Sequence, residues 1–160
     1  ATNVIDAPLL SVITPVSLDH AEHLGDSIES VAAEKAGILK RGVRAVIGPQ
    51  VPEALSIIER AAERVRAPLR VSGEHWNASE EHRRLVYQDD DGLLDLPGPK
   101  LIGRHQFVNA GVAVAALRAS GLKIPQRAYE TGLVKAEWPA RSACVTASRS
   151  VPRAGSWSVT

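Results

Sequence analysis

The sequence predicts an α/β fold with a mostly parallel sheet, flanking helices and a small β-hairpin. In the first half of the chain, short apolar runs alternate with segments of helical period, as in βαβ units with right-handed crossovers. Two short apolar runs around an Asp-Gly turn come next, and they predict the hairpin. A length of 160 residues leaves room for about one domain.

The first predicted strand covers residues 9–14, a continuous apolar run between two prolines. A short run bounded in this way is typical of a strand that is buried on both faces. A helix over about 27–40 should follow, because Asp26 can cap backbone N–H groups and Glu29 stands three residues later. The Lys-Arg-Gly sequence at 40–42 should end this helix.

The next elements alternate in the same way. Ala45–Ile47 and Leu69–Val71 predict two further strands. Residues 52–66 between them predict a helix with proline in its first turn and apolar residues on one face. Residues 107–120 and 125–136 predict two more helices, of which the first is alanine-rich and is followed by glycine.

The hairpin is expected where residues 85–87 and 93–96 flank the sequence DDDG at 89–92. Three successive aspartates would also be compatible with a metal site. We favour a solvated turn, because aspartate stabilises turns by bonding its own backbone.

Composition narrows the classes of protein. Apolar residues make up 44% of the whole chain and charged residues 23%, which excludes a chain that is disordered throughout, a collagen-like repeat and a disulfide scaffold. The net charge of +1 gives no electrostatic attraction to nucleic acid or to an anionic membrane, so we expect neither as a partner. The chain opens without the pattern of a signal peptide and has a single cysteine, and we therefore expect a cytoplasmic protein.

The two ends of the chain differ from the rest. The chain contains no methionine, and residues 141–160 hold three arginines, five serines and no acidic residue. We expect residues 1–141 to form the folded domain and residues 142–160 to be an anomalous tail, either disordered or out of frame.

The sequence DHAEH at 19–23 directly follows the first predicted strand. Ligands of open α/β sheets bind beyond the carboxyl ends of the strands, so His20 and His23 are candidate metal ligands. No third ligand is obvious, and the helical HExxH spacing is absent. The alternative is a polar loop that caps the strand.

Lys35 falls within an apolar stripe of the first predicted helix, seven residues after Ile28. Lysine is seldom buried without a partner, and burial favours its neutral amine. The alternative is a lysine whose stem covers apolar surface while its amine reaches water. The stripe is formed by Ile28, Val31, Ala32, Ala36 and Leu39.

Two further segments are candidates for nucleotide binding. The sequence GRHQFVNA at 103–110 opens the alanine-rich helix, and Asn109 offers the adjacent donor and acceptor that pair with adenine. The alternative is simple helix capping. In WPAR at 138–141, the guanidinium of Arg141 is suited to a phosphate.

Taken in order, these segments resemble the folylpolyglutamate synthase/dihydrofolate synthase family of the Mur ligase superfamily. The segments that match the family are ATNV at 1–4, SVIT at 11–14, LDH at 18–20, LG at 24–25, EKAGI at 34–38, GRHQ with NA within 103–110, and WPAR at 138–141. The resemblance covers about residues 1–141 and implies that they are part of a Mur-ligase-type central ATP-binding domain.

The resemblance implies an activity and its cofactors. The family implies an ADP-forming carboxylate-amine ligase of folate biosynthesis that uses ATP and Mg²⁺. It adds L-glutamate to dihydropteroate, to folates or to both, through an acyl-phosphate intermediate. Two alternatives stay open: a non-catalytic fragment that binds nucleotide or pterin, and a sister Mur-type ligase of cell-wall synthesis.

The resemblance also implies roles for individual residues. His20 is similar to the histidine that ligates Mg²⁺, and Lys35 to a lysine that is carbamylated and so gains a carboxylate-like group at the metal. Asn109 is similar to a residue that contacts ATP, Arg141 to an arginine that reaches its phosphates, and Ala1 to the edge of the pterin site. The family's phosphate loop would lie upstream of Ala1, so we expect the 160-residue chain alone to be inactive.

Overall fold

The computed structural model describes residues 5, 7–17, 27–101 and 103–137. Within these ranges the elements are β1 (Ser11–Ile13), α1 (Ile28–Ala36), β2 (Ala45–Ile47), α2 (Pro52–Val65), β3 (Leu69–Val71), β4 (Trp76–Glu81), β5 (Arg84–Asp89), β6 (Gly92–Pro97), α3 (Arg104–Ala119) and α4 (Gln126–Lys135). The predicted tail at 142–160 lies outside the described residues. None of the described helices has the length and hydrophobicity needed to cross a membrane.

The described strands form two separate sheets. The first is parallel with the order β1-β2-β3, and Ala45 is in register with Ser11 on one side and Leu69 on the other. The second is antiparallel with the order β4-β5-β6. The α/β fold with a parallel sheet is therefore confirmed, and the predicted hairpin is β5 and β6 of a three-stranded sheet.

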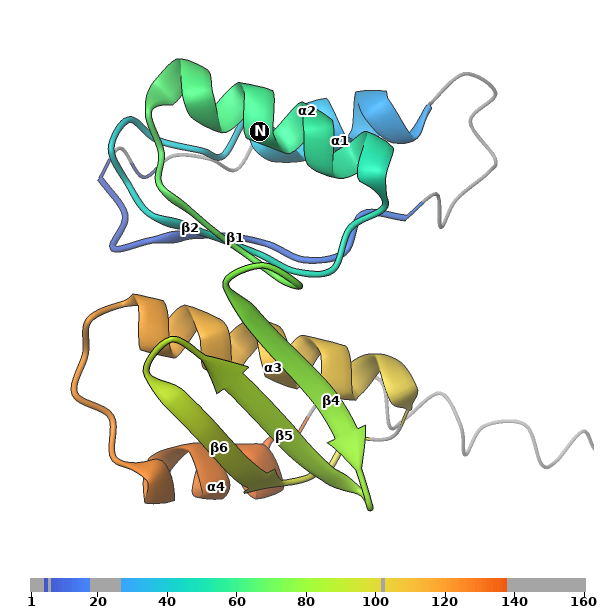
Figure 1. The fold of residues 1–160 in the computed structure, drawn as a ribbon, viewed down its shortest axis with the longest axis vertical. Helices are drawn as coiled ribbons and strands as arrows, with labels where there is room; N and C mark the ends of the chain where they lie inside the picture. The colour runs from blue at the N-terminus through green and yellow to red at the C-terminus, as the bar shows by residue number, and fades with distance from the viewer. Residues whose placement is uncertain (1–4, 6, 18–26, 102, 138–160) are drawn as a thin grey trace, which may run out of the picture.

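The elements are stacked in layers (Figure 1). Helices α1 and α2 cover one face of the parallel sheet, and α3 lies on its other face, between this sheet and the antiparallel one. Each face of the parallel sheet has its own core. The first core contains Ile13, Ala45, Ile47 and Val71 of the strands with Ala32, Ala36, Ala54 and Ile58 of the helices. The second contains Val46 with Trp76, Leu85, Tyr87, Leu96, Val112 and Val114.

Helix α1 is shorter than predicted. Ser27 is its N-cap, and the Ser27 hydroxyl accepts the N–H of Ser30 at 3.3 Å; Asp26 lies outside the described residues. The helix ends at Ala36, not at Lys40, because the chain turns at Gly37. This turn places Leu39 in the first core.

The remaining helices start and end near their predicted bounds, with one difference at α3. Helix α3 begins at Arg104, three residues before the predicted start, because Gly103 is the N-cap with a φ of 120°. Glycine adopts this backbone angle without steric cost. Asn109 therefore lies in the second turn of the helix.

The predicted solvated turn at residues 89–92 is correct only in part. The Asp89 side chain is just 3% exposed and forms an ion pair with Arg118, so the prediction of a solvated carboxylate is wrong there. Asp90 and Asp91 are exposed, and the N–H of Asp91 donates to Oδ1 of Asp89 at 3.0 Å. Aspartate bonding to the backbone of its own turn was the expected stabilisation.

Two helical glycines allow a matched test of packing. A Cβ at Gly111 would lie 2.5 Å from Cβ of Ala78, so α3 and β4 are too close for a methyl group, whereas a Cβ at Gly132 of α4 meets nothing within 4 Å. We expect Gly111→Ala to lower the free energy of unfolding by about 1–3 kcal/mol. Gly132→Ala should raise it by roughly 0.5–1 kcal/mol through helix propensity. Urea unfolding of both variants measures the difference, and stabilisation by Gly111→Ala would contradict the close contact.

Candidate functional site

We expected the candidate ligands at the carboxyl edge of the parallel sheet. Two backbone hydrogen bonds between the strands mark this edge: the N–H of Gly48 donates to the carbonyl of Ile13 at 2.8 Å, and the N–H of Ser72 donates to the carbonyl of Ile47 at 3.0 Å. Ligands of open α/β sheets bind beyond this edge. The segments that leave β1 and β2 therefore form the base of the candidate site.

Gln50 joins these two segments. Its Nε2 donates to the carbonyl of Thr14 at 3.0 Å, and its Oε1 accepts the N–H of Val16 at 3.0 Å. The segment after β1 is thus bonded to the segment after β2. Sequence reasoning missed this role, although a glutamine directly beyond a buried strand was a signal for it.

Helix α3 extends past the same edge. Near its C-terminus, the Ala119 carbonyl accepts Nη1 of Arg44 at 2.6 Å, just before β2 begins. Val112, which is closer to the N-terminus of α3, packs against Gly48, the residue directly after β2. A Cβ at Gly48 would lie 2.9 Å from Cγ2 of Val112. The helix therefore runs opposite to β2, and its eight residues before Val112, about 12 Å of helix, project beyond the carboxyl edge.

Asn109 lies on this projecting part. It comes three residues before Val112, so the two residues share a side of α3. Asn109 is exposed, and its Nδ2 donates to Oε1 of Gln106 at 3.4 Å. Asn109 itself does not cap the helix, because Gly103 of the same segment occupies the N-cap position. The carboxamide of Asn109 is thus presented near the carboxyl edge.

Lys35 is exposed, so the apolar stripe does not turn it inward, and its exposure supports the alternative of a lysine whose amine reaches water. The buried side of α1 is centred on Ala32 and Ala36. Lys35 comes seven residues after Ile28, so the two residues lie on the same side of the helix. Ile28 is itself only half-buried, and this side is therefore at the edge of the buried face. The amine of Lys35 has no hydrogen-bond or ion-pair partner among the described residues.

Lys35 lies in the last turn of α1, near the end of the helix that reaches the start of β1. A helix that connects two parallel strands runs opposite to them, so α1 begins at the carboxyl edge. Near its far end, the Ile38 carbonyl accepts the hydroxyl of Ser11 at 3.3 Å, at the start of β1. Lys35 lies one turn back from Ile38, and helical side chains lean toward the N-terminus of their helix.

The structure describes two of the five predicted site residues. Lys35 and Asn109 lie on helices that cover opposite faces of the parallel sheet. Ala1, His20 and Arg141 lie outside the described residues, as does His23. Within the described ranges, no group of three or more His, Cys, Asp or Glu side chains is placed to hold a metal ion.

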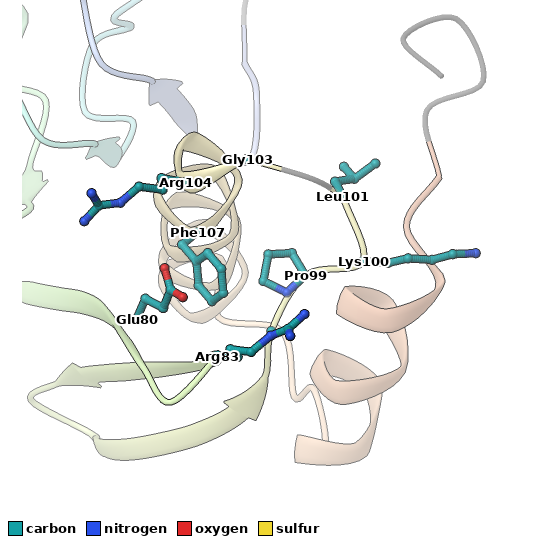
Figure 2. A pocket seen from close by; sticks show the side chains of 9 residues that line it. Glu80, Arg83, Pro99, Lys100, Leu101, Gly103, Arg104 and Phe107 are labelled. Carbon is teal, nitrogen blue, oxygen red and sulfur yellow. The ribbon is translucent and has the colours of Figure 1, made fainter. Parts of the chain in front are cut away.

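A cleft of about 430 Å³ lies on another part of the molecule, between the β4–β5 turn, the segment after β6 and the first turn of α3. A Cβ at Gly98 would lie 2.4 Å from the carbonyl oxygen of Arg83, so only glycine fits there. Two of the three basic side chains around the cleft point away from each other: Lys100 extends away to pair with Glu137, and Arg104 points to the opposite side, whereas Arg83 lies beside Pro99 (Figure 2). The cleft therefore lacks converging charges for an anion.

Comparison with known proteins gives the family. No family model matches the chain. The dihydrofolate synthase/folylpolyglutamate synthase of Bacillus subtilis is 35% identical over 150 residues, covering 88% of this chain and 35% of that protein. The Escherichia coli protein of the same name is 38% identical over 149 residues, covering 92% of this chain and 34% of that protein. The chain belongs to the dihydrofolate synthase/folylpolyglutamate synthase family. It spans about a third of the length of these curated relatives.

Solved structures of the dihydrofolate synthase/folylpolyglutamate synthase family share the fold. Escherichia coli FolC in complex with DHPP and ADP superposes with a TM-score of 0.74 at 38% identity, covering 86% of this chain and 32% of that chain. The apo form of L. casei FPGS gives a TM-score of 0.74 at 31% identity, covering 88% of this chain and 36% of that chain. The parallel sheet, the antiparallel sheet and their helices are thus a segment of this family's fold.

Proposed function

We propose that this chain is part of the central ATP-binding domain of an ATP-dependent ligase, with residues 1–141 as that part. The ligase adds L-glutamate to dihydropteroate, to folates or to both. One observation carries the proposal: the 38% identity to the Escherichia coli enzyme extends over 92% of this chain, and a solved structure of FolC from that organism contains both DHPP and ADP. We also propose a cytoplasmic location, where ATP is available as a substrate.

The proposed reaction has two steps. A carboxylate oxygen of the pterin substrate attacks the γ-phosphorus of ATP, which forms an acyl phosphate and releases ADP. The amine of L-glutamate then attacks the acyl carbon, an amide bond forms, and inorganic phosphate leaves with the bridging oxygen. Catalysis of phosphoryl transfer is mostly positioning and neutralisation of charge, so the protein's task is to hold the nucleotide and the acceptor in line.

Asn109 and Arg141 are the proposed contacts of ATP, and Ala1 is the proposed edge of the pterin site. The position of Asn109 supports its role, since an exposed carboxamide near the carboxyl edge can offer a donor and an acceptor to the adenine. Arg141 and Ala1 lie outside the described residues, and their roles rest on the family resemblance.

His20 and Lys35 are the proposed ligands of Mg²⁺, which neutralises phosphate charge when it is bound. The exposed amine of Lys35 fits this role only as a carbamate, because an ammonium would be repelled by the cation. Carbon dioxide adds to a neutral amine, forming an N–C bond with loss of one proton, and the product offers the oxygen ligands that Mg²⁺ prefers.

A substrate comparison on a full-length enzyme that carries this segment tests the proposal. ADP release is measured with dihydropteroate, tetrahydrofolate or a UDP-muramoyl acceptor, each with and without L-glutamate. We expect release that requires glutamate together with one of the two pterin acceptors. Release with the UDP-muramoyl acceptor alone would show a cell-wall ligase instead. ATP binding without any turnover would indicate a non-catalytic protein.

A further inference from the structure

We propose that Gln106 is a positioning residue that, together with His105, fixes the orientation of the Asn109 carboxamide. The three side chains lie in the first two turns of α3 and are joined by two hydrogen bonds. The bonded geometry is independent of what the protein does. That the oriented carboxamide faces a nucleotide rests on the proposed function.

The two hydrogen bonds have a defined direction. Nε2 of Gln106 can only donate, and it lies 2.9 Å from Nε2 of His105, so this ring nitrogen must accept. The neutral His105 ring therefore carries its proton on Nδ1. Oε1 of Gln106 accepts the N–H of Nδ2 of Asn109 at 3.4 Å, which is long for a hydrogen bond. Gln106 thus uses one end of its carboxamide for His105 and the other end for Asn109.

The backbone at the start of α3 holds the His105 ring in place. A Cβ at Gly103 would lie 2.5 Å from Cε1 and 2.8 Å from Nδ1 of His105, so the ring packs directly against the glycine. The N–H of Gln106 donates to the Gly103 carbonyl at 2.9 Å, which fixes the same turn. Asn109 comes three residues after Gln106 and shares its side of the helix. The cluster is thus anchored at the N-cap and extends toward Asn109.

The cluster reduces the number of arrangements that the Asn109 side chain can adopt. Asn109 is exposed, and without a partner it would sample about three χ1 wells and two orientations of the carboxamide. The bond to Gln106 determines which end of the carboxamide is the nitrogen, and Oδ1 has no other partner among the described residues.

The orientation matters for the proposed nucleotide contact. Adenine presents its N6 donor and N7 acceptor in a fixed order, so only one orientation of a carboxamide matches both atoms. A ligand that needs one arrangement out of about six binds up to about sixfold more weakly when that arrangement is not fixed. Loss of Gln106 should therefore weaken ATP binding by a few-fold and leave the chemical step nearly unchanged.

The first experiment measures the cluster by NMR in the 160-residue chain. In the parent, the imidazole nitrogen shifts should show the Nδ1–H tautomer of His105, and three-bond couplings should show one χ1 well for Asn109. Gln106→Ala removes both bonds, so the His105 ring should shift toward the Nε2–H tautomer and the χ1 of Asn109 should become averaged. Gln106→Glu keeps the acceptor for Asn109 but has no donor for His105, so only the His105 signals should change.

A matched control accompanies these variants. Gln88→Ala removes an exposed carboxamide of β5 and should leave the signals of His105 and Asn109 as in the parent. An Nε2–H tautomer of His105 in the parent would overturn the proposal. So would an Asn109 side chain that is averaged to the same degree in the parent and in Gln106→Ala.

The second experiment measures the nucleotide dependence of a full-length enzyme that carries this segment. Gln106→Ala should raise the KM for ATP by about three- to sixfold, with kcat changed by less than about twofold. Gln106→Glu should retain most of the affinity for ATP, and Gln88→Ala should match the parent. Asn109→Ala should raise the KM for ATP by about tenfold. Adding Gln106→Ala to Asn109→Ala should have no further effect, because no carboxamide is left to orient.

The double variant separates positioning from direct contact. If Gln106→Ala weakens ATP binding equally with and without Asn109, Gln106 acts on the nucleotide itself and the proposal is overturned. A KM for ATP that responds to Asn109→Ala but not to Gln106→Ala overturns it as well. A KM for ATP that is unchanged in Asn109→Ala contradicts the proposed ATP contact instead, and the χ1 of Asn109 then decides the role of Gln106.

Discussion

Replacement of Arg118 by alanine is expected to lower the free energy of unfolding by about 3–5 kcal/mol, because it leaves a buried carboxylate without its partner. Nε and Nη2 of Arg118 each donate to an oxygen of Asp89 at 2.6 Å. The Asp89 side chain is 3% exposed and that of Arg118 is 17% exposed, so water cannot replace the lost bonds easily. The pair ties the end of β5 to the C-terminal half of α3.

Tyr87 lies against this pair, and Trp76 stacks on Tyr87. The Tyr87 hydroxyl donates to Oδ2 of Asp89 at 3.1 Å, and the Arg118 guanidinium lies 5.8 Å from the centre of the Tyr87 ring. Trp76 stacks on Tyr87 with ring centres 5.9 Å apart. Burial, and next the charge of Asp89, raises the pKa of Tyr87 above its usual value, so the hydroxyl keeps its proton as a donor.

The effect of Arg118→Ala should depend on pH. Burial alone would raise the pKa of Asp89, but the hydrogen bonds and charge of Arg118 outweigh it and hold this pKa below its ordinary value of 3.8. A carboxyl with a lowered folded pKa stabilises the protein above its unfolded pKa, and this stability is lost as the pH falls through the folded pKa. Without Arg118, only the hydrogen bonds from Tyr87 and the Asp91 N–H still oppose the effect of burial, so the pKa of Asp89 should rise relative to the parent. Protonation of Asp89 in acid should then reduce the destabilisation of the variant. The difference in the free energy of unfolding between the parent and Arg118→Ala should decrease as the pH approaches 3.8.

Urea unfolding at neutral and acidic pH measures both effects. Arg118→Lys keeps the positive charge but not the two-pronged bond, and should lie between the parent and Arg118→Ala. Arg127→Ala, at an exposed position of α4, is the control and should change the stability by less than about 0.5 kcal/mol. Equal losses for Arg118→Ala and Arg127→Ala would show that the Asp89 pair contributes nothing.

Lys35→Ala should reduce turnover of a full-length enzyme that carries this segment by more than about a hundredfold, as expected for loss of a metal ligand. Because Lys35 is exposed and has no partner among the described residues, the same change should alter the free energy of unfolding by less than about 0.5 kcal/mol. Steady-state kinetics and urea unfolding on the same preparations separate the chemical role from a structural one.

The carbamate role also predicts that a carboxylate can partly replace Lys35. Lys35→Glu restores a carboxylate at the site and should recover a small part of the activity, and a short carboxylic acid added to Lys35→Ala should do the same. Lys123→Ala removes an exposed lysine between α3 and α4 and should have parent kinetics. Near-normal turnover of Lys35→Ala would contradict both the carbamate and the proposed metal site.

The parts of the fold that depend on local apolar pattern were predictable. Ala45–Ile47 and Leu69–Val71 form strands with the expected bounds, because short runs between turn residues specify buried parallel strands. Strand β4 was missed, since only Trp76 of its six residues is buried and the rest carry no alternating apolar pattern. The end of α1 was misplaced because Gly37, inside the expected helix, was not recognised as the turn.

The errors in the candidate site have a common cause: they depend on contacts between distant residues. The partner of Asp89 is Arg118, 29 residues away, and nothing in the local sequence links them. Gln50 bonds to Thr14 across 36 residues, and only the packed sheet brings them together. The helical period alone left open whether Lys35 turns inward or reaches water, because its exposure depends on which residues α2 and the sheet cover.

Isotope transfer tests the central claim most directly. A full-length enzyme that carries this segment is given ATP, L-glutamate and dihydropteroate whose carboxylate is labelled with the heavy isotope of oxygen, and the released phosphate is examined by mass spectrometry. Attack of the carboxylate on ATP followed by attack of glutamate delivers one carboxylate oxygen to phosphate in each turnover. We therefore expect every released phosphate to carry one labelled oxygen, whereas unlabelled phosphate accompanying amide formation would contradict the proposed ligase mechanism.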